Sequence, residues 1–320
     1  MNMIELFIYT FLISIITLVM FIPKFRKIKI SQYEREEGPK SHLSKQGTPT
    51  LGGLIIILVV TFVFIIVSIK QKFAIEKMIT ILFPLVSFGL IGFIDDYLVI
   101  KKRNNKGLNW KTKIVLEVII SIIYLILLDK SGHFYEVKIF NLIINNKILY
   151  YLFFIFIMVG ASNAVNLTDG LDGLAGGLSL LNLLSIIFLT INNNEEINYF
   201  SFILISSLLA FMCFNYHPAR IFMGDTGSLA LGATIASLFI VLKYEFFIII
   251  FMNIFIIEVL SVIVQILYFK KTKGKRLLLM APLHHHYELK GFSELKVDFL
   301  FWIFGILMNL LGLFLIYKFY

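Results

Sequence analysis

The sequence predicts an all-α polytopic membrane protein with about ten transmembrane helices. Three observations lead to this fold class: 59% of the 320 residues are hydrophobic, only 15% are charged, and the mean hydropathy is +0.89. Ordinary soluble domains are roughly 45–50% apolar and about 25% charged. A soluble enzyme of this composition, with 33 Phe, would expose too much apolar surface to water, so lipid must solvate most of the surface.

Ten apolar stretches are long enough, or nearly so, to cross a bilayer as helices, which takes about 20 residues each. In chain order they are Met3–Ile22, Leu51–Ser68, Ile79–Ile94, Ile114–Leu128, Ile148–Ala161, Leu171–Ile191, Ile197–Phe214, Ser228–Leu242, Phe246–Phe269 and Val297–Tyr317. The first lacks a preceding basic residue and a small-residue cleavage site, so we interpret it as an anchor rather than a signal peptide. No repeat of fixed period divides the chain, which predicts one membrane domain over residues 1–320.

The positions of the 29 Lys and Arg residues predict the orientation. The loops after odd-numbered spans carry 21 of them, and the other loops with the C-terminal tail carry eight. Basic loops face the cytoplasm, so we expect both termini outside. This distribution explains the net charge of +9 without a nucleic-acid partner. The single cysteine, Cys213, excludes a disulfide scaffold and a cysteine-based metal site.

Polar residues near lipid are costly and usually mark functional sites. Five polar clusters are the densest: Lys45–Gly53, Asp95–Asp96, Asn163–Asp172, Asn215–Ser228 and His284–Lys290. All five fall in cytoplasmic loops or at the adjoining helix ends. Alternating spans would bring them to one membrane face, where we expect a single active site.

The aspartates of these clusters are the first candidates for chemistry. Asp95 and Asp96 are helix neighbours that point about 100° apart, so we expect different roles, with an interfacial cap as the alternative. Asp169 and Asp172, placed at the start of the next helix, would share a side near its positive end. Asp225 lies between glycines in a loop that could present it to a divalent metal, although it could instead cap the following helix.

The remaining polar and aromatic candidates are less specific. Gly176 and Gly177 could serve close ligand approach or helix packing equally well. Phe222 could stack on a nucleotide base or face lipid.

His284, His285 and His286 cannot all reach one metal because successive side chains diverge. Two of them could donate to phosphate oxygens or hold the geometry of the three histidines. The alternatives are an incidental polar tract or a weak metal-binding patch. Glu258 and Gln265 share a helix face that should turn inward. We expect His42, His133 and His217 to be solvated or interfacial.

This inventory of carboxylates, cations and glycine turns, with no serine or cysteine nucleophile beside a base, suits phosphoryl transfer, in which Mg²⁺ and cations spread the developing charge. A cytoplasmic mouth among apolar helices suggests one soluble anionic substrate and one lipid substrate. The spacing of the residues does not identify either.

Five motifs resemble those of the phospho-N-acetylmuramoyl-pentapeptide transferase family, part of the polyprenyl-phosphate N-acetylhexosamine-1-phosphate transferase superfamily. They are Gly38–Gly53, Gly92–Tyr97, Asn163–Ala175, Phe222–Ala233 and Met280–Gly291, and the resemblance covers nearly the whole chain. It implies ten spans, a bacterial plasma-membrane location and a homodimer. It also implies that undecaprenyl phosphate attacks UDP-N-acetylmuramoyl-pentapeptide, giving the first lipid-linked peptidoglycan precursor and UMP.

The resemblance also implies site residues. Asp225 would be the Mg²⁺-binding and catalytic carboxylate, Asp95 the base toward the lipid phosphate, and Asp96 its partner. The positions that match the nucleotide pocket are Asn166, Asp169, Gly170, Leu171, Asp172 and Phe222. Further substrate-contacting positions are Lys45, Thr50, Asn215, Gln265, Ala281, His284, His285 and His286.

One departure from the family pattern concerns a lysine. The family usually has Lys three residues after the second aspartate of the pair, where this chain has Val99. We hypothesise that Lys101 or Lys102 supplies the charge.

Two alternative functions remain. The nearer is a sister transferase that uses UDP-N-acetylglucosamine, and the three consecutive histidines favour the muramoyl branch. The more distant is an ion-coupled transporter, which the one-sided placement of the aspartates disfavours.

Overall fold

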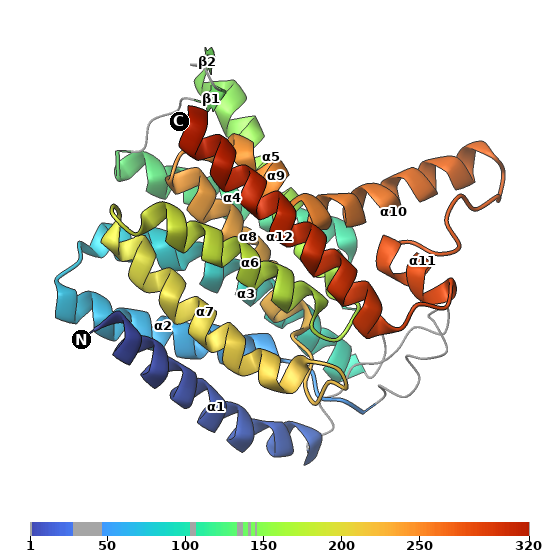
Figure 1. Cartoon of the computed structure of the whole chain (residues 1–320), viewed down its shortest axis with the longest axis horizontal. Coiled ribbons are helices and arrows are strands. Elements are labelled where there is room, and N and C mark those ends of the chain that lie inside the picture. The colour runs from blue at the N-terminus through green and yellow to red at the C-terminus, as the bar shows by residue number, and fades with distance from the viewer. Residues whose placement is uncertain are drawn as a thin grey trace.

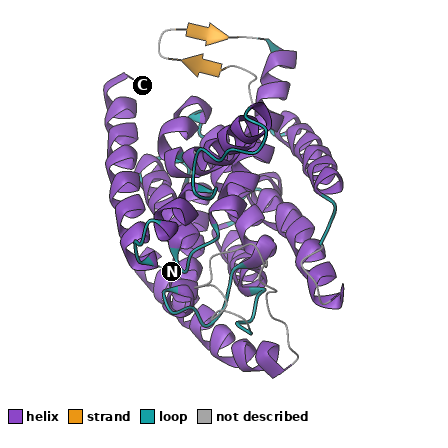
Figure 2. Ribbon diagram, turned by 90° about the vertical axis from the view of Figure 1, so that its right-hand side faces the viewer, coloured by secondary structure: helices purple, strands orange, loops and turns teal. Residues whose placement is uncertain are grey.

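A computed structural model describes residues 2–27, 47–102, 107–132, 137–139, 142–144 and 146–319, and this part of the chain is almost entirely helical, which confirms the all-α class. The long helices are α1 (Met3–Lys27), α2 (Gly52–Gln71), α3 (Ile75–Lys102), α4 (Trp110–Lys130), α5 (Lys147–Thr168), α6 (Leu174–Thr190), α7 (Glu195–Asn215), α8 (Gly224–Val241), α10 (Asn253–Lys271) and α12 (Glu294–Phe319). Shorter elements are the 3-10 helix η2 (Glu245–Phe247), α9 (Ile248–Phe251) and α11 (Leu283–Leu289). Strands β1 (Val137–Ile139) and β2 (Leu142–Ile144) form an antiparallel hairpin at one end of the bundle (Figure 2).

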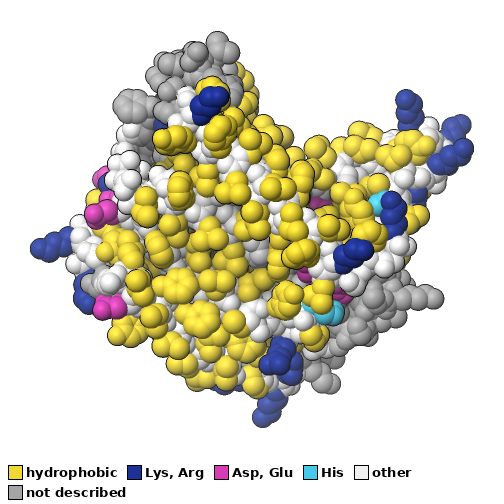
Figure 3. Space-filling view, viewed as in Figure 1, with side chains coloured by type: hydrophobic (Ala, Val, Ile, Leu, Met, Phe, Trp, Pro, Cys, Tyr) yellow, Lys and Arg dark blue, Asp and Glu magenta, His cyan; other side chains and the backbone are white. Residues whose placement is uncertain are grey.

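The chain is a multi-pass membrane protein. Eight of the described helices are long and apolar enough to cross a bilayer: α1, α2, α3, α5, α7, α8, α10 and α12. The other two expected spans are the more highly charged α4 and the 17-residue apolar α6. Figure 3 shows hydrophobic side chains covering the viewed face, with cations at its rim, as expected of a lipid-facing surface. The number of ten spans and the orientation stay predictions.

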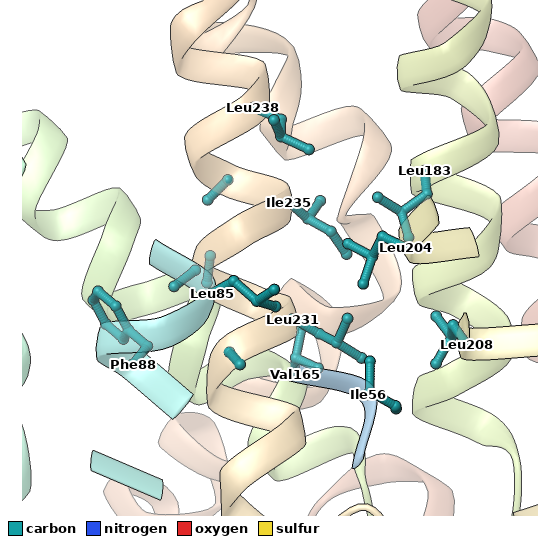
Figure 4. Close-up of a cluster of buried hydrophobic side chains, with 14 of the residues drawn as sticks. Ile56, Leu85, Phe88, Val165, Leu183, Leu204, Leu208, Leu231, Ile235 and Leu238 are labelled. Atoms are coloured by element: carbon teal, nitrogen blue, oxygen red, sulfur yellow. The ribbon is translucent and has the colours of Figure 1, made fainter. Parts of the chain in front are cut away.

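Helix α8 is the centre of the bundle. Its residues are 83% buried inside the protein, and Leu231, Ile235 and Leu238 lie in the core cluster of Figure 4. Two glycines allow close packing around it, because a Cβ at Gly92 of α3 would overlap the Asp225 carbonyl and a Cβ at Gly53 of α2 would overlap Gly227. The first turn of α8 is therefore held between α2 and α3.

The expected ninth span, Phe246–Phe269, is not one helix. It is broken into η2, α9 and α10 around Met252. Two asparagines satisfy carbonyls at the break: Asn253 Nδ2 donates to Ile250 O (2.6 Å) and Asn309 Nδ2 of α12 donates to Phe251 O (3.3 Å). Such partners make a helix break tolerable in an apolar environment. Beyond the break α10 extends away from the bundle (Figure 1).

Candidate active site

The carboxylates Asp96 and Asp225 meet where α3 approaches the first turn of α8. Asp96 is 8% exposed. Its Oδ2 accepts hydrogen bonds from Thr226 N (3.0 Å) and Thr226 Oγ1 (2.6 Å), and its Oδ1 accepts from Asp225 N (3.1 Å). The first turn of a helix has unsatisfied N–H groups and a partial positive charge, both of which a carboxylate stabilises. Asp96 therefore caps α8 from a neighbouring helix and fixes the backbone of Asp225.

Asp95 has different partners, as the divergence of neighbouring helix residues predicts. Its Oδ1 accepts from Leu108 N (2.8 Å), and Gly107 lies directly against its carboxylate. Asp95 also interacts electrostatically with Asp225 and with Lys113. Two carboxylates this close would repel each other if both were ionised, and a cation beside them would offset that repulsion.

Lys113, in the first turn of α4, provides that cation. Its Nζ lies 2.6 Å from Asp225 Oδ2, and its side chain is only 12% exposed. Sequence reasoning counted Lys113 only among the loop lysines. A usable signal was present, because Lys113 and Glu117 are four residues apart on an apolar helix and so share a face. By contrast, Lys101 Nζ lies 6.0 Å from the ring centre of Tyr97, and the hypothesis for Lys101 and Lys102 stays a prediction.

Asn166 and Asn163 extend the cluster along α5. Asn166 Nδ2 donates to Asp225 Oδ1 (2.8 Å) and to Ser228 Oγ (2.9 Å), so both Asp225 oxygens accept from protein donors. One turn earlier, Asn163 Nδ2 donates to Glu117 Oε2 (2.5 Å). Glu117 is fully buried, which places a second carboxylate one helical turn behind Lys113.

The turn after α5 differs from the expectation for Asp169 and Asp172. Helix α6 begins only at Leu174, after Gly173 with φ 92°. Asp169 instead follows the last residue of α5, where its N–H donates to Val165 O (3.1 Å). The prediction that both aspartates share a side of one helix is therefore wrong, because a glycine turn separates the two helices. Asp172 is buried, and its Oδ2 accepts from Ala219 N (2.9 Å).

His217 is part of this turn region rather than an isolated solvated residue. Its Nδ1 lies 3.2 Å from Asp172 Oδ2 and 3.6 Å from Glu294 Oε2 of α12. Asp172, His217 and Glu294 are the one group of His, Cys, Asp or Glu side chains among the described residues that is close enough to hold a metal. The side chain of His217 is still 37% exposed, so the expectation that it is solvated or interfacial stays a prediction. Its proximity to Asp172 depends on the fold and not on local sequence.

The segment Pro49–Gly53 pairs with the chain just before Asp225. Phe222 N donates to Pro49 O (2.8 Å), Gly52 N donates to Phe222 O (2.9 Å), and Gly53 N donates to Met223 O (2.9 Å). Phe222 is half-buried and Thr50 is buried with its hydroxyl beside Gly224. Thr50 and Phe222 thus lie together at the mouth of α8. Lys45 lies outside the described residues.

Asn215 connects the nucleotide-pocket candidates. Its Oδ1 accepts from Gly173 N (3.1 Å), and its Nδ2 donates to Ile221 O (3.0 Å). Gly176 and Gly177, one turn into α6, contact the side chains of Met212 and Trp302. Helix packing is therefore what the structure shows for these two glycines.

Helix α11 places the three histidines in three directions. The backbone N–H groups of Leu283 and His284 donate to Glu258 (2.7 and 3.1 Å), whose Oε2 also lies 3.3 Å from His284 Nδ1. Glu258 and His284 are fully buried, and His284 Nε2 lies against Gly170. His284 therefore packs against the turn from Asp169 to Asp172.

His285 and His286 have their own partners. His285 Nδ1 lies 2.7 Å from Glu288 Oε2, whereas His286 Nδ1 accepts from Leu279 N (3.1 Å). Burial, followed by the charge of Lys290, lowers the pKa of His286, which favours the unprotonated ring that this hydrogen bond needs.

Gln265 forms hydrogen bonds with the backbone of the loop before α11. Its Oε1 accepts from Leu277 N (3.1 Å) and Leu278 N (2.9 Å), and its Nε2 donates to Leu278 O (3.2 Å). Ala281 is half-buried in the same loop. The prediction that Glu258 and Gln265 face the protein is confirmed for Glu258, while Gln265 faces this loop.

The chain is similar to known proteins along nearly its whole length. The profile of glycosyl transferase family 4 matches residues 78–243. The chain is 42% identical over 308 residues to the phospho-N-acetylmuramoyl-pentapeptide-transferase of Bacillus licheniformis, covering 95% of each chain. It is 44% identical over 312 residues to the enzyme of that name from Staphylococcus carnosus, covering 96% of this chain and 97% of the other. The Bacillus subtilis enzyme is 41% identical over 308 residues, with 95% of each chain covered.

Proposed function

Because the chain belongs to the phospho-N-acetylmuramoyl-pentapeptide-transferase family, within glycosyl transferase family 4, we propose that it transfers phospho-N-acetylmuramoyl-pentapeptide from UDP to undecaprenyl phosphate. The reaction forms a new P–O bond between the lipid phosphate and the sugar-linked phosphorus. The P–O bond to UMP breaks, and UMP leaves. The product would be lipid I, for peptidoglycan synthesis at the bacterial plasma membrane.

The observation that carries this proposal is the cluster of Asp225, Asp95, Lys113 and Asn166 at one end of an apolar bundle. Phosphoryl transfer needs charge compensation and positioning more than covalent chemistry from the protein. Lys113 supplies a buried positive charge, and Asp96 fixes the backbone that carries Asp225. A lipid substrate and a soluble nucleotide can meet only at such an interface between lipid and water.

We propose Asp225 as the carboxylate that holds Mg²⁺, with Asp95 beside it. Carboxylate and amide oxygens are the ligands this hard cation prefers, and Asp225, Asp95 and Asn166 offer them together. When bound, Mg²⁺ would stabilise the negative charge that develops on the transferring phosphate. Since Lys113 contacts Asp225, it neutralises the same carboxylate that would hold the cation.

Proposed roles for the other residues follow from their positions. Asp95 would accept the proton of the lipid phosphate. Thr50, Asn166, Asn215 and Phe222, with the turn from Asp169 to Asp172, would bind the nucleotide. His284, set against Gly170, would face a phosphate oxygen of the nucleotide, and Lys45, Gln265, Ala281, His285 and His286 would complete the substrate contacts. The homodimer implied by the resemblance is part of the proposal.

The test is UMP release by the purified protein in detergent with undecaprenyl phosphate and Mg²⁺. UDP-N-acetylmuramoyl-pentapeptide and UDP-N-acetylglucosamine are offered separately. We expect release from the first alone. Release from the second alone would move the chain to the sister activity, and release from neither by folded protein would contradict the proposal. Omission of Mg²⁺ should abolish turnover.

A further inference from the structure

The far end of α10 carries an unusually dense group of cations. Five basic side chains lie within seven positions, and no Asp or Glu occurs between Glu258 and Glu288. They are Lys270, Lys271, Lys273, Lys275 and Arg276, and all are exposed. Helix α10 protrudes from the bundle as an arm, and Figure 3 shows dark blue side chains at its far end. We call residues 270–279 the basic tip.

Exposed leucines follow the cations directly. Leu277 is 52% exposed and Leu279 is 49% exposed. Along α10 itself, Leu260 and Leu267 are 50% and 62% exposed, so the helix leading to the tip presents apolar side chains to its surroundings. A soluble anion gains nothing from exposed leucines. The headgroup region of a bilayer offers phosphates for the cations and the edge of the acyl layer for the leucines.

The shape of the basic tip is fixed by hydrogen bonds. Gln265 holds the backbone of Leu277 and Leu278 from inside the arm. At the end of α10, Gly274 adopts φ 114° and its N–H donates to Phe269 O (2.9 Å), which closes the helix C-terminus. The cations and the leucines are therefore held on one short, structured turn.

We propose that the basic tip is an interfacial anchor that binds the headgroups of anionic phospholipids. Each basic residue near an anionic bilayer surface contributes roughly a fivefold gain in affinity. Binding would fix the far end of α10, whose opposite half carries Glu258 and, through it, α11. The composition of the membrane would then affect the arm without any change in the carboxylate cluster.

The test measures lipid retention by the full chain in detergent, by native mass spectrometry with phosphatidylglycerol or phosphatidylcholine. The main variant changes all five cations to Gln. We expect its affinity for phosphatidylglycerol to fall at least about tenfold, with phosphatidylcholine unaffected. A charge-conserving variant with Lys→Arg at the four lysines and Arg276→Lys should bind as the unchanged chain does. Lys70→Gln with Lys72→Gln removes two exposed cations at the far end of α2 and serves as the matched control.

Unchanged phosphatidylglycerol binding by the five-Gln variant would overturn the proposal. If the same variant also had a raised KM for the nucleotide substrate, the cations would bind a soluble anion instead. If the five-Gln variant does not fold, Lys273→Gln with Lys275→Gln should still lower the affinity by roughly tenfold or more, and a drop within twofold would contradict the anchor. Leu277→Ser with Leu279→Ser tests the apolar part and should also weaken lipid retention.

Discussion

At the scale of single residues, Lys113 provides a positive charge beside a cluster of three aspartates. Asp95, Asp96 and Asp225 would repel one another if no cation stood among them. Asp96 accepts hydrogen bonds from backbone N–H groups in the first turn of α8, and Lys113 contacts Asp225 directly. Each carboxylate thus has its own means of stabilisation. The arrangement leaves Asp225 and Asp95 as the pair whose charge a substrate or metal can alter.

We predict that Lys113→Met lowers turnover at least about 100-fold, because removal of one preorganised charge at a transition state typically costs that much. UMP release measures the effect. Lys111→Met, an exposed lysine on the same helix turn, is the matched control and should stay within twofold. Lys113→Arg should restore part of the activity. Turnover of Lys113→Met within threefold of the unchanged chain would show that Lys113 is dispensable.

Sequence patterns could predict the aspartates, but not their partners. Carboxylates and amides near lipid are unusual enough to identify Asn166 and Asp225 without a structure. Lys113 is one of several lysines in a basic loop, and His217 follows a helix end with no local motif. Their partners come from helices far away in the chain, so only the packing of the helices shows which lysine and which histidine reach an aspartate.

At the scale of elements, close contact between α3 and α8 carries the site. Gly92 lies against the Asp225 carbonyl, and Asp96, one turn later, caps the same helix. The long helices themselves were predictable from apolar length alone, since each of the ten apolar stretches corresponds to a described helix or group of helices. The break at Met252 could not be predicted, because Asn309, which donates a hydrogen bond to a carbonyl at the break, lies on α12. A hydropathy pattern has no signal for a carbonyl partner on another helix.

We predict that Gly92→Ala destabilises the protein and lowers turnover at least about tenfold, because the added Cβ would displace the backbone that carries Asp225. Overpacking of this kind typically costs 1–3 kcal/mol. The measurements are the Tm in detergent and UMP release. Gly160→Ala is the control, because the Cβ would meet open space and Ala favours the helix. Equal effects of the two substitutions would argue against a tight contact at Gly92.

At the scale of the whole molecule, titratable groups also occur away from the carboxylate cluster. Glu245, in η2, is 3% exposed, and its burial raises the pKa to about 7, with Lys243 opposing the shift. The pKa is raised in the folded state, so the neutral carboxyl stabilises the fold below the unfolded pKa of 4.5. That contribution is lost as the pH rises to about 7.

We predict that the Tm of the unchanged chain falls more between pH 5 and pH 8 than that of Glu245→Gln, which cannot ionise. The difference in the free energy of unfolding should be at most about 3 kcal/mol. Thermal unfolding in detergent at both values of pH provides the measurement. Glu195→Gln, an exposed glutamate in the first turn of α7, should leave the pH dependence unchanged. The same pH dependence in Glu245→Gln would mean that other groups cause it.

The orientation of the whole bundle is a prediction that the distribution of charge makes. Lys72 follows α2, just before α3 begins, and Lys102 is the last residue of α3. If α3 crosses the membrane, these two lysines lie on opposite sides of it. The 21 basic residues in the loops after odd-numbered spans predict that Lys102, with the aspartates near it, faces the cytoplasm. That is where UDP-linked substrates are made, so the proposed reaction requires the same orientation.

We predict that, in a Cys213→Ser background, Lys72→Cys reacts with a membrane-impermeant maleimide on intact cells, whereas Lys102→Cys reacts only after permeabilisation. Cys213 is the single cysteine of the chain, so its replacement leaves no competing thiol. Labelling of both variants in permeabilised cells is the control for exposure. The reverse pattern would invert the bundle and put the carboxylate cluster outside the cell, away from nucleotide sugars. Such a result would refute the proposed transfer reaction even if every contact around Asp225 were correct.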